Sequence, residues 1–207
     1  MSSIALVVIA RDEARCIARC LDSAREWVDQ MWVLDTGSLD ATPHIARQRG
    51  AQVAGFAWCD DFAAARNAAL ALTDCDWRLV LDADEWLESG GEALAALRRQ
   101  PDAFLGQVCV ASAVDAAAAG EQQSLSWLTR VLPRGVRYAG RVHEQPISAL
   151  PRRRIDLRLG HDGYQPAQMV RKGARNLLLL NKALREYPDD AYLHYQLGKD
   201  HEVHGRF

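Results

Sequence analysis

The stretch LVLDADEWLE, Leu79 to Glu88, decides how this sequence is interpreted. A run of large apolar residues stops abruptly, and three carboxylates follow at once, those of Asp82, Asp84 and Glu85. Like charges this close raise each other's pKa and cost free energy unless a cation or hydrogen-bond donors compensate them. The segment therefore predicts a compensating partner at the end of a buried strand.

The composition is that of an ordinary globular chain, with 207 residues, 49% of them hydrophobic, and a formal net charge of −2. This length suffices for one well-buried domain, alone or with an appendage. The small net charge argues against a nucleic-acid partner. The N-terminus lacks the basic region of a signal peptide, and no apolar stretch approaches the ~18 residues of a membrane span. We expect a cytoplasmic protein, and contact with the inner face of the membrane stays open.

Strand and helix patterns alternate from Ile4 to Asp82, with short turns between them. Apolar, β-branched runs indicate buried strands, and apolar residues that recur every three or four positions indicate helices. The alternation is typical of βαβ units, so we expect an α/β fold with a mostly parallel sheet flanked by helices. The predicted strands are Ile4–Ile9, Met31–Asp35, Gln52–Phe56 and Trp77–Leu81, and the predicted helices are Ala14–Trp27, Thr42–Arg49 and Phe62–Leu72.

Carboxylates stand at the ends of two of these predicted strands. Asp35 ends the second strand, and Asp82 follows the fourth. Ligands of parallel sheets bind beyond the carboxyl ends of the strands. We therefore expect both carboxylates to face one cleft.

The pattern weakens after Glu92 and becomes helical again from Ala167, with a second helix near Asp190. Between these parts the chain is rich in arginine, which is interpreted either as a solvated face or as a positive lining for a phosphorylated ligand. A loop is predicted over Asp115–Ser124. The arginines are Arg134, Arg137, Arg141, Arg152, Arg153, Arg154 and Arg158.

The D-x-D of Asp82 and Asp84 suits a hard divalent ion. Mg²⁺ and Mn²⁺ take few protein carboxylates and complete their shell with substrate phosphates and water. The competing interpretation is a helix N-terminus whose first-turn acids interact with the helix dipole. Glu85 and Glu88 fit that second interpretation equally well, and D-x-D alone is a signal of low specificity.

The motifs together resemble family 2 glycosyltransferases, which have the nucleotide-diphospho-sugar transferase (GT-A) fold. The resemblance covers nearly the whole chain and is closest to a bacterial subgroup. It is carried by VLDTGSLDAT (Val33–Thr42), FAWCDDFAAARN (Phe56–Asn67), WRLVLDADE (Trp77–Glu85), YAGRVHE (Tyr138–Glu144) and HDGY (His161–Tyr164).

This resemblance implies roles for the site residues. Asp35 would contact the nucleobase or ribose, and Arg66 the base or the diphosphate, although Arg66 could also be a helix-surface ion-pair partner. Asp82 would reach the ribose and orient metal-bound water. Asp84 would coordinate Mn²⁺ or Mg²⁺, which bridges the two phosphates of the donor.

An inverting transferase also needs a base for the acceptor hydroxyl. By its place in the RVHE motif, Glu144 is the candidate. His143 is a candidate phosphate donor, and His161 is a candidate metal ligand or diphosphate contact. Either histidine could instead be structural, and Tyr164 could simply pack.

One feature departs from the pattern of the subgroup, and a second lies beyond its catalytic part. Asp12 replaces the Asn that usually precedes the Glu after the first strand, which puts the contacts of that loop in doubt. The C-terminal AYLHYQLGKDHEVHGRF resembles the start of a tetratricopeptide repeat and stops inside it. We divide the chain into a catalytic domain, residues 1–165, and a helical segment, residues 166–207, and prefer truncation over helices that pack back on the domain.

Three other functions are weighed against this one. A nicotinamide enzyme lacks support because the loop after the first strand has no GxGxxG. A phosphatase with an aspartyl nucleophile needs a lysine downstream of that nucleophile. Lysine is almost absent from this chain, and the first one, Lys172, lies in the predicted C-terminal helix, which argues against a phosphatase. The third is a non-catalytic helical-repeat interaction protein with a decayed transferase domain.

The sequence therefore predicts a metal-dependent inverting hexosyltransferase. Its donor would be a nucleotide-diphospho-sugar, with UDP-glucose suggested by the resemblance. The acceptor would be a glycan, a lipid-linked molecule or a peptide, in lipopolysaccharide or other cell-surface glycan synthesis or in peptide glycosylation. The oligomeric state is open.

Overall fold

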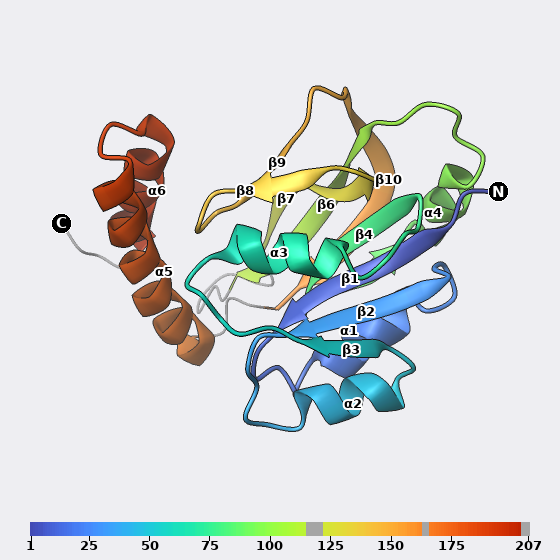
Figure 1. Ribbon diagram of the computed structural model, residues 1–207, viewed down its shortest axis with the longest axis horizontal. Helices are drawn as coiled ribbons and strands as arrows, with labels where there is room; N and C mark the ends of the chain where they lie inside the picture. The colour runs from blue at the N-terminus through green and yellow to red at the C-terminus, as the bar shows by residue number, and fades with distance from the viewer. Residues whose placement is uncertain (115–121, 163–165, 204–207) are drawn as a thin grey trace.

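The computed structural model describes residues 1–114, 122–162 and 166–203, and Figure 1 shows their arrangement. The predicted alternation of strands and helices is present in the first part of the chain. Its elements are β1 (Ile4–Ala10), α1 (Ile17–Ala24), β2 (Gln30–Asp35), α2 (Thr42–Gln48), β3 (Gln52–Gly55), α3 (Phe62–Leu70) and β4 (Trp77–Asp82).

The second part of the chain contributes more strands than the sequence predicted. Its elements are β5 (Glu85–Ser89), α4 (Gly91–Leu97), β6 (Leu105–Val114), β7 (Gln122–Pro133), β8 (Arg137–Ala139), β9 (Gln145–Ile147), β10 (Arg152–His161), α5 (Pro166–Glu186) and α6 (Ala191–Val203). Most of the predicted Asp115–Ser124 loop lies outside the described residues, and its last residues begin β7.

Eight strands form one sheet in the order β3-β2-β1-β4-β7-β6-β10-β5. The pairs β2–β3, β1–β2, β1–β4 and β6–β10 are parallel, so the predicted fold class, a mostly parallel sheet flanked by helices, is confirmed. The register pairs Ala10 with Asp35 and Ile9 with Asp82. The carboxyl ends of β2 and β4 therefore lie at the same edge of the sheet.

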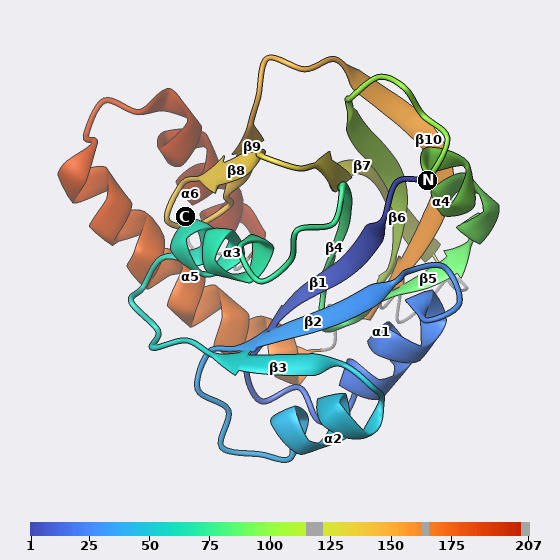
Figure 2. The ribbon, with the colours of Figure 1, turned by 45° about the vertical axis from the view of Figure 1, so that its right-hand side comes forward.

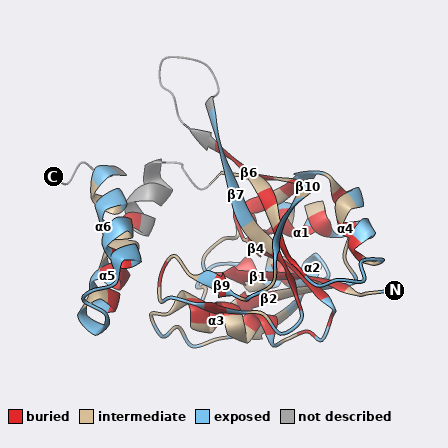
Figure 3. Ribbon diagram, turned by 90° about the horizontal axis from the view of Figure 1, so that it is seen from above, coloured by how far each residue is buried: buried red, intermediate tan, exposed pale blue. Residues whose placement is uncertain are grey.

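The central strand β1 is buried on both faces, which explains its unbroken apolar run. Ile4, Leu6 and Val8 pack on one face against α1, α2 and α4, whereas Ala5 and Val7 pack on the other against α3. Figure 2 shows α1 and α2 on the opposite side of the sheet from α3. Figure 3 shows the buried residues concentrated along the central strands.

The segment after D-x-D is a strand, so the interpretation of its acids as the first turn of a helix is wrong. Residues Glu85–Ser89 form β5, which pairs antiparallel with β10 at the edge of the sheet. Glu85 and Glu88 are therefore not helix-start acids. The next helix, α4, begins only at Gly91.

Helices α5 and α6 pack back against the rest of the chain, beside α3 and β8 in Figure 1. Leu179, Leu180 and Leu193 form a small core with Val142 and the rings of Trp58 and Phe62. A further link is the bidentate pair between Arg141 Nη2 and Glu186, at 2.6 and 2.9 Å. The two helices therefore bury apolar side chains against the rest of the chain, and truncation stays a prediction. The proposed boundary at residue 165 remains a prediction.

Within the described ranges no helix has both the length and the apolar character that crossing a bilayer requires.

The loop after β1 is tied to the loop after β2, and Asp12 is the main link. Its backbone has φ 55°, in the left-handed region that asparagine and aspartate tolerate better than other side chains. Its carboxylate accepts a hydrogen bond from Leu39 N (2.7 Å), and its own N–H donates to Ser38 Oγ (2.9 Å). Asp12 thus takes the place of the usual Asn through its backbone conformation and these hydrogen bonds.

This geometry predicts that Asp12→Asn changes the free energy of unfolding by less than about 0.5 kcal/mol, because asparagine keeps both the acceptor and the left-handed backbone. Asp12→Ala should lower it by about 2 kcal/mol, because it loses the hydrogen bond and strains the backbone. Urea unfolding measures both values. Equal losses for the two variants would contradict this role of Asp12.

Candidate active site

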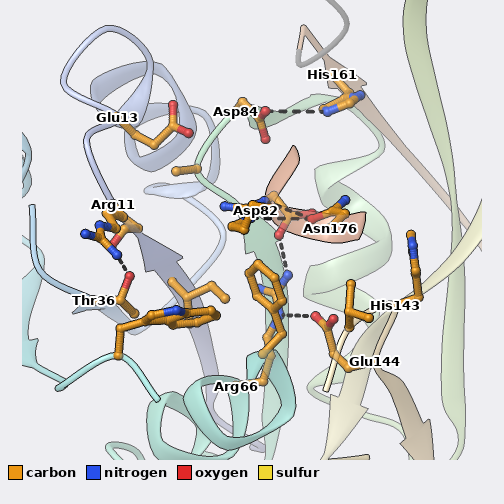
Figure 4. A pocket seen from close by; sticks show the side chains of 17 residues that line it. Arg11, Glu13, Thr36, Arg66, Asp82, Asp84, His143, Glu144, His161 and Asn176 are labelled. Carbon is orange, nitrogen blue, oxygen red and sulfur yellow. Dashed lines mark hydrogen bonds and ion pairs between the residues drawn. The ribbon is translucent and has the colours of Figure 1, made fainter. Parts of the chain in front are cut away.

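The carboxyl edge of the sheet opens into a cavity of about 250 Å³, shown in Figure 4. Its wall is built from the ends of β1 and β4, helix α3, the loop before β9, the end of β10 and the middle of α5. Six of the seven predicted site residues line it: Arg66, Asp82, Asp84, His143, Glu144 and His161.

Asp82 is held between two arginines. Arg66 Nη2 donates to its Oδ1, and Arg130 Nη2 donates to its Oδ2 at 2.6 Å. Burial by itself would raise the pKa of Asp82, but the charges of Arg130 and Arg66 lower it well below its ordinary range. The donors that compensate the first carboxylate of D-x-D are therefore side chains of the protein. Asp82 is ionised, and its side chain keeps 37% of its surface exposed.

Glu85 belongs to the same charged cluster and forms its buried side. Its side chain is 2% exposed and accepts hydrogen bonds from Arg130 Nη2 and from the backbone N–H of Asp82 (2.9 Å). Burial raises the pKa of Glu85, and the charge of Asp82 adds to this, whereas Arg130 opposes it. Glu85 thus supports the D-x-D turn and does not line the cavity.

Helix α3 positions Arg66 and Asn67 for two different tasks. The helix begins at the N-cap Asp61, whose carboxylate accepts from Ala64 N (2.9 Å). Arg66 is buried and donates to Glu144 Oε1 (3.0 Å) as well as to Asp82, so it is not the helix-surface residue of the alternative interpretation. Asn67 exchanges two hydrogen bonds with the backbone of Tyr138 (2.8 and 2.9 Å). The AARN motif therefore fixes the loop that carries Glu144.

That loop turns sharply before β9. Gly140 (φ 98°) and His143 (φ 52°) both adopt left-handed backbone conformations, and for histidine this is a strained choice of the kind that concentrates at functional positions. The turn brings Glu144 to Arg66 at the cavity wall. Burial lowers the pKa of His143, and the nearby Glu144 only partly opposes this. His143 is therefore a neutral side chain at pH 7.

Asp84 and His161 lie together on the other side of the cavity. His161 Nε2 is 3.6 Å from Asp84 Oδ2, and its Nδ1 is 3.0 Å from Ser112 Oγ, which orients the ring. Arg15 and Arg19 bind the adjacent Asp162 and hold the end of β10 against α1. Tyr164 lies outside the described residues.

These two side chains suit a hard divalent ion. One buried carboxylate and one oriented imidazole are a small ligand set, such as Mg²⁺ or Mn²⁺ uses when substrate oxygens and water complete the shell. The described part of the chain contains no group of three or more histidine, cysteine or acidic side chains able to hold a metal. Any ion here would therefore depend on oxygens of the bound substrate.

Asp35 is the predicted site residue that does not line the cavity. Its carboxylate accepts from the backbone N–H of Ser38 at 3.2 and 3.3 Å and so closes the turn after β2. Its neighbour Thr36 does line the cavity and donates to Ala10 O (3.2 Å). A nucleoside contact by Asp35 remains a prediction.

Of the two interpretations of the arginine-rich segment, the structure favours the solvated face for β10, and none of the seven arginines lines the cavity. Arg152, Arg153 and Arg154 are exposed on β10, and Arg158 pairs with Glu88 at 2.6 Å on the surface. The cavity takes its arginines from other places, namely Arg11, Arg66 and Arg175. Arg130 was missed too, although an arginine inside the apolar run of β7 is a signal for a buried partner.

The site can thus place a divalent ion beside Asp84 and His161. At the cavity wall, Arg66 joins the carboxylate of Glu144 to that of Asp82. The model of the family described as glycosyl transferase family 2 matches residues 5–174.

Two relatives match nearly the whole chain. A TPR repeat-containing protein of Synechococcus elongatus is 37% identical over 96% of this chain and 52% of its own length. The glycosyltransferase SunS of Bacillus subtilis is 26% identical over 93% of this chain and 48% of its own. The chain therefore spans about half the length of these relatives.

Among solved structures, the chain is similar to glucosyl-3-phosphoglycerate synthase of Mycobacterium tuberculosis in complex with Mn²⁺, UDP and glucosyl-3-phosphoglycerate. That similarity has 24% identity and a TM-score of 0.45, and covers 53% of this chain and 44% of the other. TarS of S. aureus in complex with UDP has 18% identity and a TM-score of 0.46, and covers 56% and 38%.

The buried cluster predicts a large effect of Arg130→Met on stability. The free energy of unfolding should fall by about 3–5 kcal/mol, because the variant leaves the carboxylate of Glu85 buried without its cation. Urea unfolding measures the change. Arg134→Met, which removes an exposed arginine near the end of β7, is the matched control and should cost less than about 1 kcal/mol.

Coupling within the cluster is tested by adding Glu85→Gln. The double variant should lose clearly less stability than the sum of the two single losses, because the neutral amide introduced by Glu85→Gln no longer needs the cation. Strict additivity would contradict the buried pair.

Proposed function

Because the chain belongs to glycosyl transferase family 2, we propose that it transfers a hexose from a nucleotide-diphospho-sugar, with UDP-glucose as the first candidate, to an acceptor hydroxyl with inversion. The observation that carries this proposal is the bridge from Asp82 through Arg66 to Glu144 across the cavity wall. It holds a donor-side carboxylate and a carboxylate suited to act as a base in fixed relation to each other.

On the donor side, Asp84 and His161 would hold Mn²⁺ or Mg²⁺. The bound ion would supply electrostatic stabilisation of the leaving diphosphate. Arg11 and Arg175 line the same cavity and suit the charge of the phosphates. Asp82, ionised and fixed by two arginines, is a rigid acceptor for a hydroxyl of the ribose or of the transferred sugar.

On the acceptor side, Glu144 would take the proton of the attacking hydroxyl. The acceptor oxygen then forms its bond to the anomeric carbon as the bond from that carbon to the diphosphate oxygen breaks, and the nucleoside diphosphate leaves. Arg66 orients Glu144 through its Nε at 3.0 Å, so the base needs no reorganisation. Neutral His143 beside it is suited to donate one hydrogen bond.

The metal assignment predicts that Asp84→Ala removes the dependence of UDP binding on Mn²⁺. Calorimetry of wild type should show at least tenfold tighter UDP binding with Mn²⁺ than without it, and the variant should show equal affinities. Asp76→Ala, on the exposed loop before β4, is the control and should behave like wild type. Retained Mn²⁺ dependence would refute the ligand role of Asp84.

The same titration tests the function as a whole. If UDP fails to bind wild type with and without metal while a protein partner does bind, the interaction-module alternative replaces the transferase.

The base assignment predicts that Glu144→Gln keeps UDP affinity within about twofold of wild type, because glutamine can still accept from Arg66 Nε. The rate of sugar transfer should fall by about 10²–10⁴-fold, the range for loss of a general base. Glu186→Gln, at an exposed pair with Arg141, is the matched control. Transfer at a near wild-type rate would mean that another group is the base.

A further inference from the structure

A second and larger cavity, of about 620 Å³, lies on the other side of the Asp82–Arg66–Glu144 bridge. Arg66, Asp82, His143 and Glu144 line both cavities, whereas Asp84 and His161 line only the smaller one. A base for the acceptor must face both the donor and the acceptor. The larger cavity is therefore the space from which an acceptor hydroxyl can approach Glu144.

Helix α6 forms the outer wall of this larger cavity. Tyr192, Gln196, Lys199 and Asp200 line it, and their spacing of three and four residues places them on one face of the helix. All four lie beyond residue 174, where the match to the family ends. This wall is therefore formed by residues outside the part of the chain that the family model matches.

The hairpin holds this wall in place through contacts with the loop of Glu144. Tyr192 Oη donates to His143 O and accepts from Gln145 Nε2, both at 3.3 Å. On its other side the hairpin is anchored by the core of Leu179, Leu180 and Leu193 with Val142. The base and the outer wall are thus positioned by the same short loop.

The chemistry of the lining favours a neutral acceptor. Three cations, Arg66, Arg130 and Lys199, are balanced by the carboxylates of Asp82, Glu144 and Asp200. The remaining polar groups are the imidazole of His143 and a set of amides and hydroxyls, among them Gln145, Gln196, Ser126 and Thr129. Such groups recognise sugar hydroxyls, and a volume of about 620 Å³ lies within the range of small-ligand sites.

We propose that the larger cavity binds a neutral, polyhydroxylated glycan acceptor and that α6, through Gln196, determines which acceptor is accepted. This inference rests on the proposed transferase function and adds the acceptor class and the element that selects it. Gln196 is suited to this role because its amide lines the cavity and has no hydrogen-bond partner among the described residues.

The test begins with wild type and UDP-glucose, UDP-galactose and UDP-N-acetylglucosamine. The sugar nucleotide that is hydrolysed fastest is then used with methyl β-glucoside, maltose and lactose, with glucose 6-phosphate, and with a peptide that contains serine and cysteine. A neutral glycoside should accelerate UDP release. Acceleration only by the phosphorylated sugar, only by the peptide, or by none of these probes would overturn the acceptor class.

Gln196→Ala should raise the KM for the accelerating glycoside about fivefold to tenfold, the loss expected for one hydrogen bond, with kcat and donor hydrolysis unchanged. Gln196→Trp should place a bulky ring in the cavity and weaken the acceleration while donor hydrolysis continues. Glu202→Ala, exposed on the same helix outside the lining, is the control. An unchanged KM in both Gln196 variants would overturn the role of α6.

The readouts separate the two proposals. Absence of both UDP binding and donor hydrolysis in wild type overturns the transferase function, and this inference with it. Donor hydrolysis that is present but indifferent to α6 variants overturns this inference alone.

Discussion

The pairing of Asp82 with Arg66 and Arg130 is the interaction on which the site depends. A carboxylate at the end of a buried strand is costly unless cations or donors balance it, and here the buried Arg66 and the largely buried Arg130 do so, one at each carboxylate oxygen. Each arginine also binds a second carboxylate, Glu144 for Arg66 and Glu85 for Arg130. One network at this end of the sheet therefore joins five side chains, those of Asp82, Arg66, Arg130, Glu144 and Glu85. The position of each depends on the others.

This network joins parts of the chain that are far apart in sequence. Arg66 comes from α3, Arg130 from β7 and Glu144 from the loop before β9, and Asn67 clamps that loop by its backbone. The loop in turn carries the contacts to α6. The catalytic part and the C-terminal hairpin thus share one structural element, and a glycan acceptor would be bound between them.

Much of the fold could be predicted because its information is local. The apolar run Ile4–Ile9 and the turn residues around Thr42 and Gly50 indicate strands and helix ends without any tertiary contact. The second half could not be predicted in this way. The edge strand β5 has two acids in five residues, so its pattern does not show that β10 pairs with it. The arginines of β10 could be a solvated face or a ligand lining from the sequence, because sequence spacing cannot show which way a strand faces.

The sequence by itself determined the alternating fold, the convergence of Asp35 and Asp82 on one sheet edge, and the motifs that resemble family 2 glycosyltransferases. Tertiary structure decided what compensates each charge. It made Arg130 the partner of Glu85, turned Asp35 into a turn-closing residue and left Asp84 beside His161. It also set α6 across the second cavity. The physical reason is that strand and helix periodicity are properties of neighbouring residues, whereas the balance of buried charge depends on side chains that only folding brings within hydrogen-bond distance.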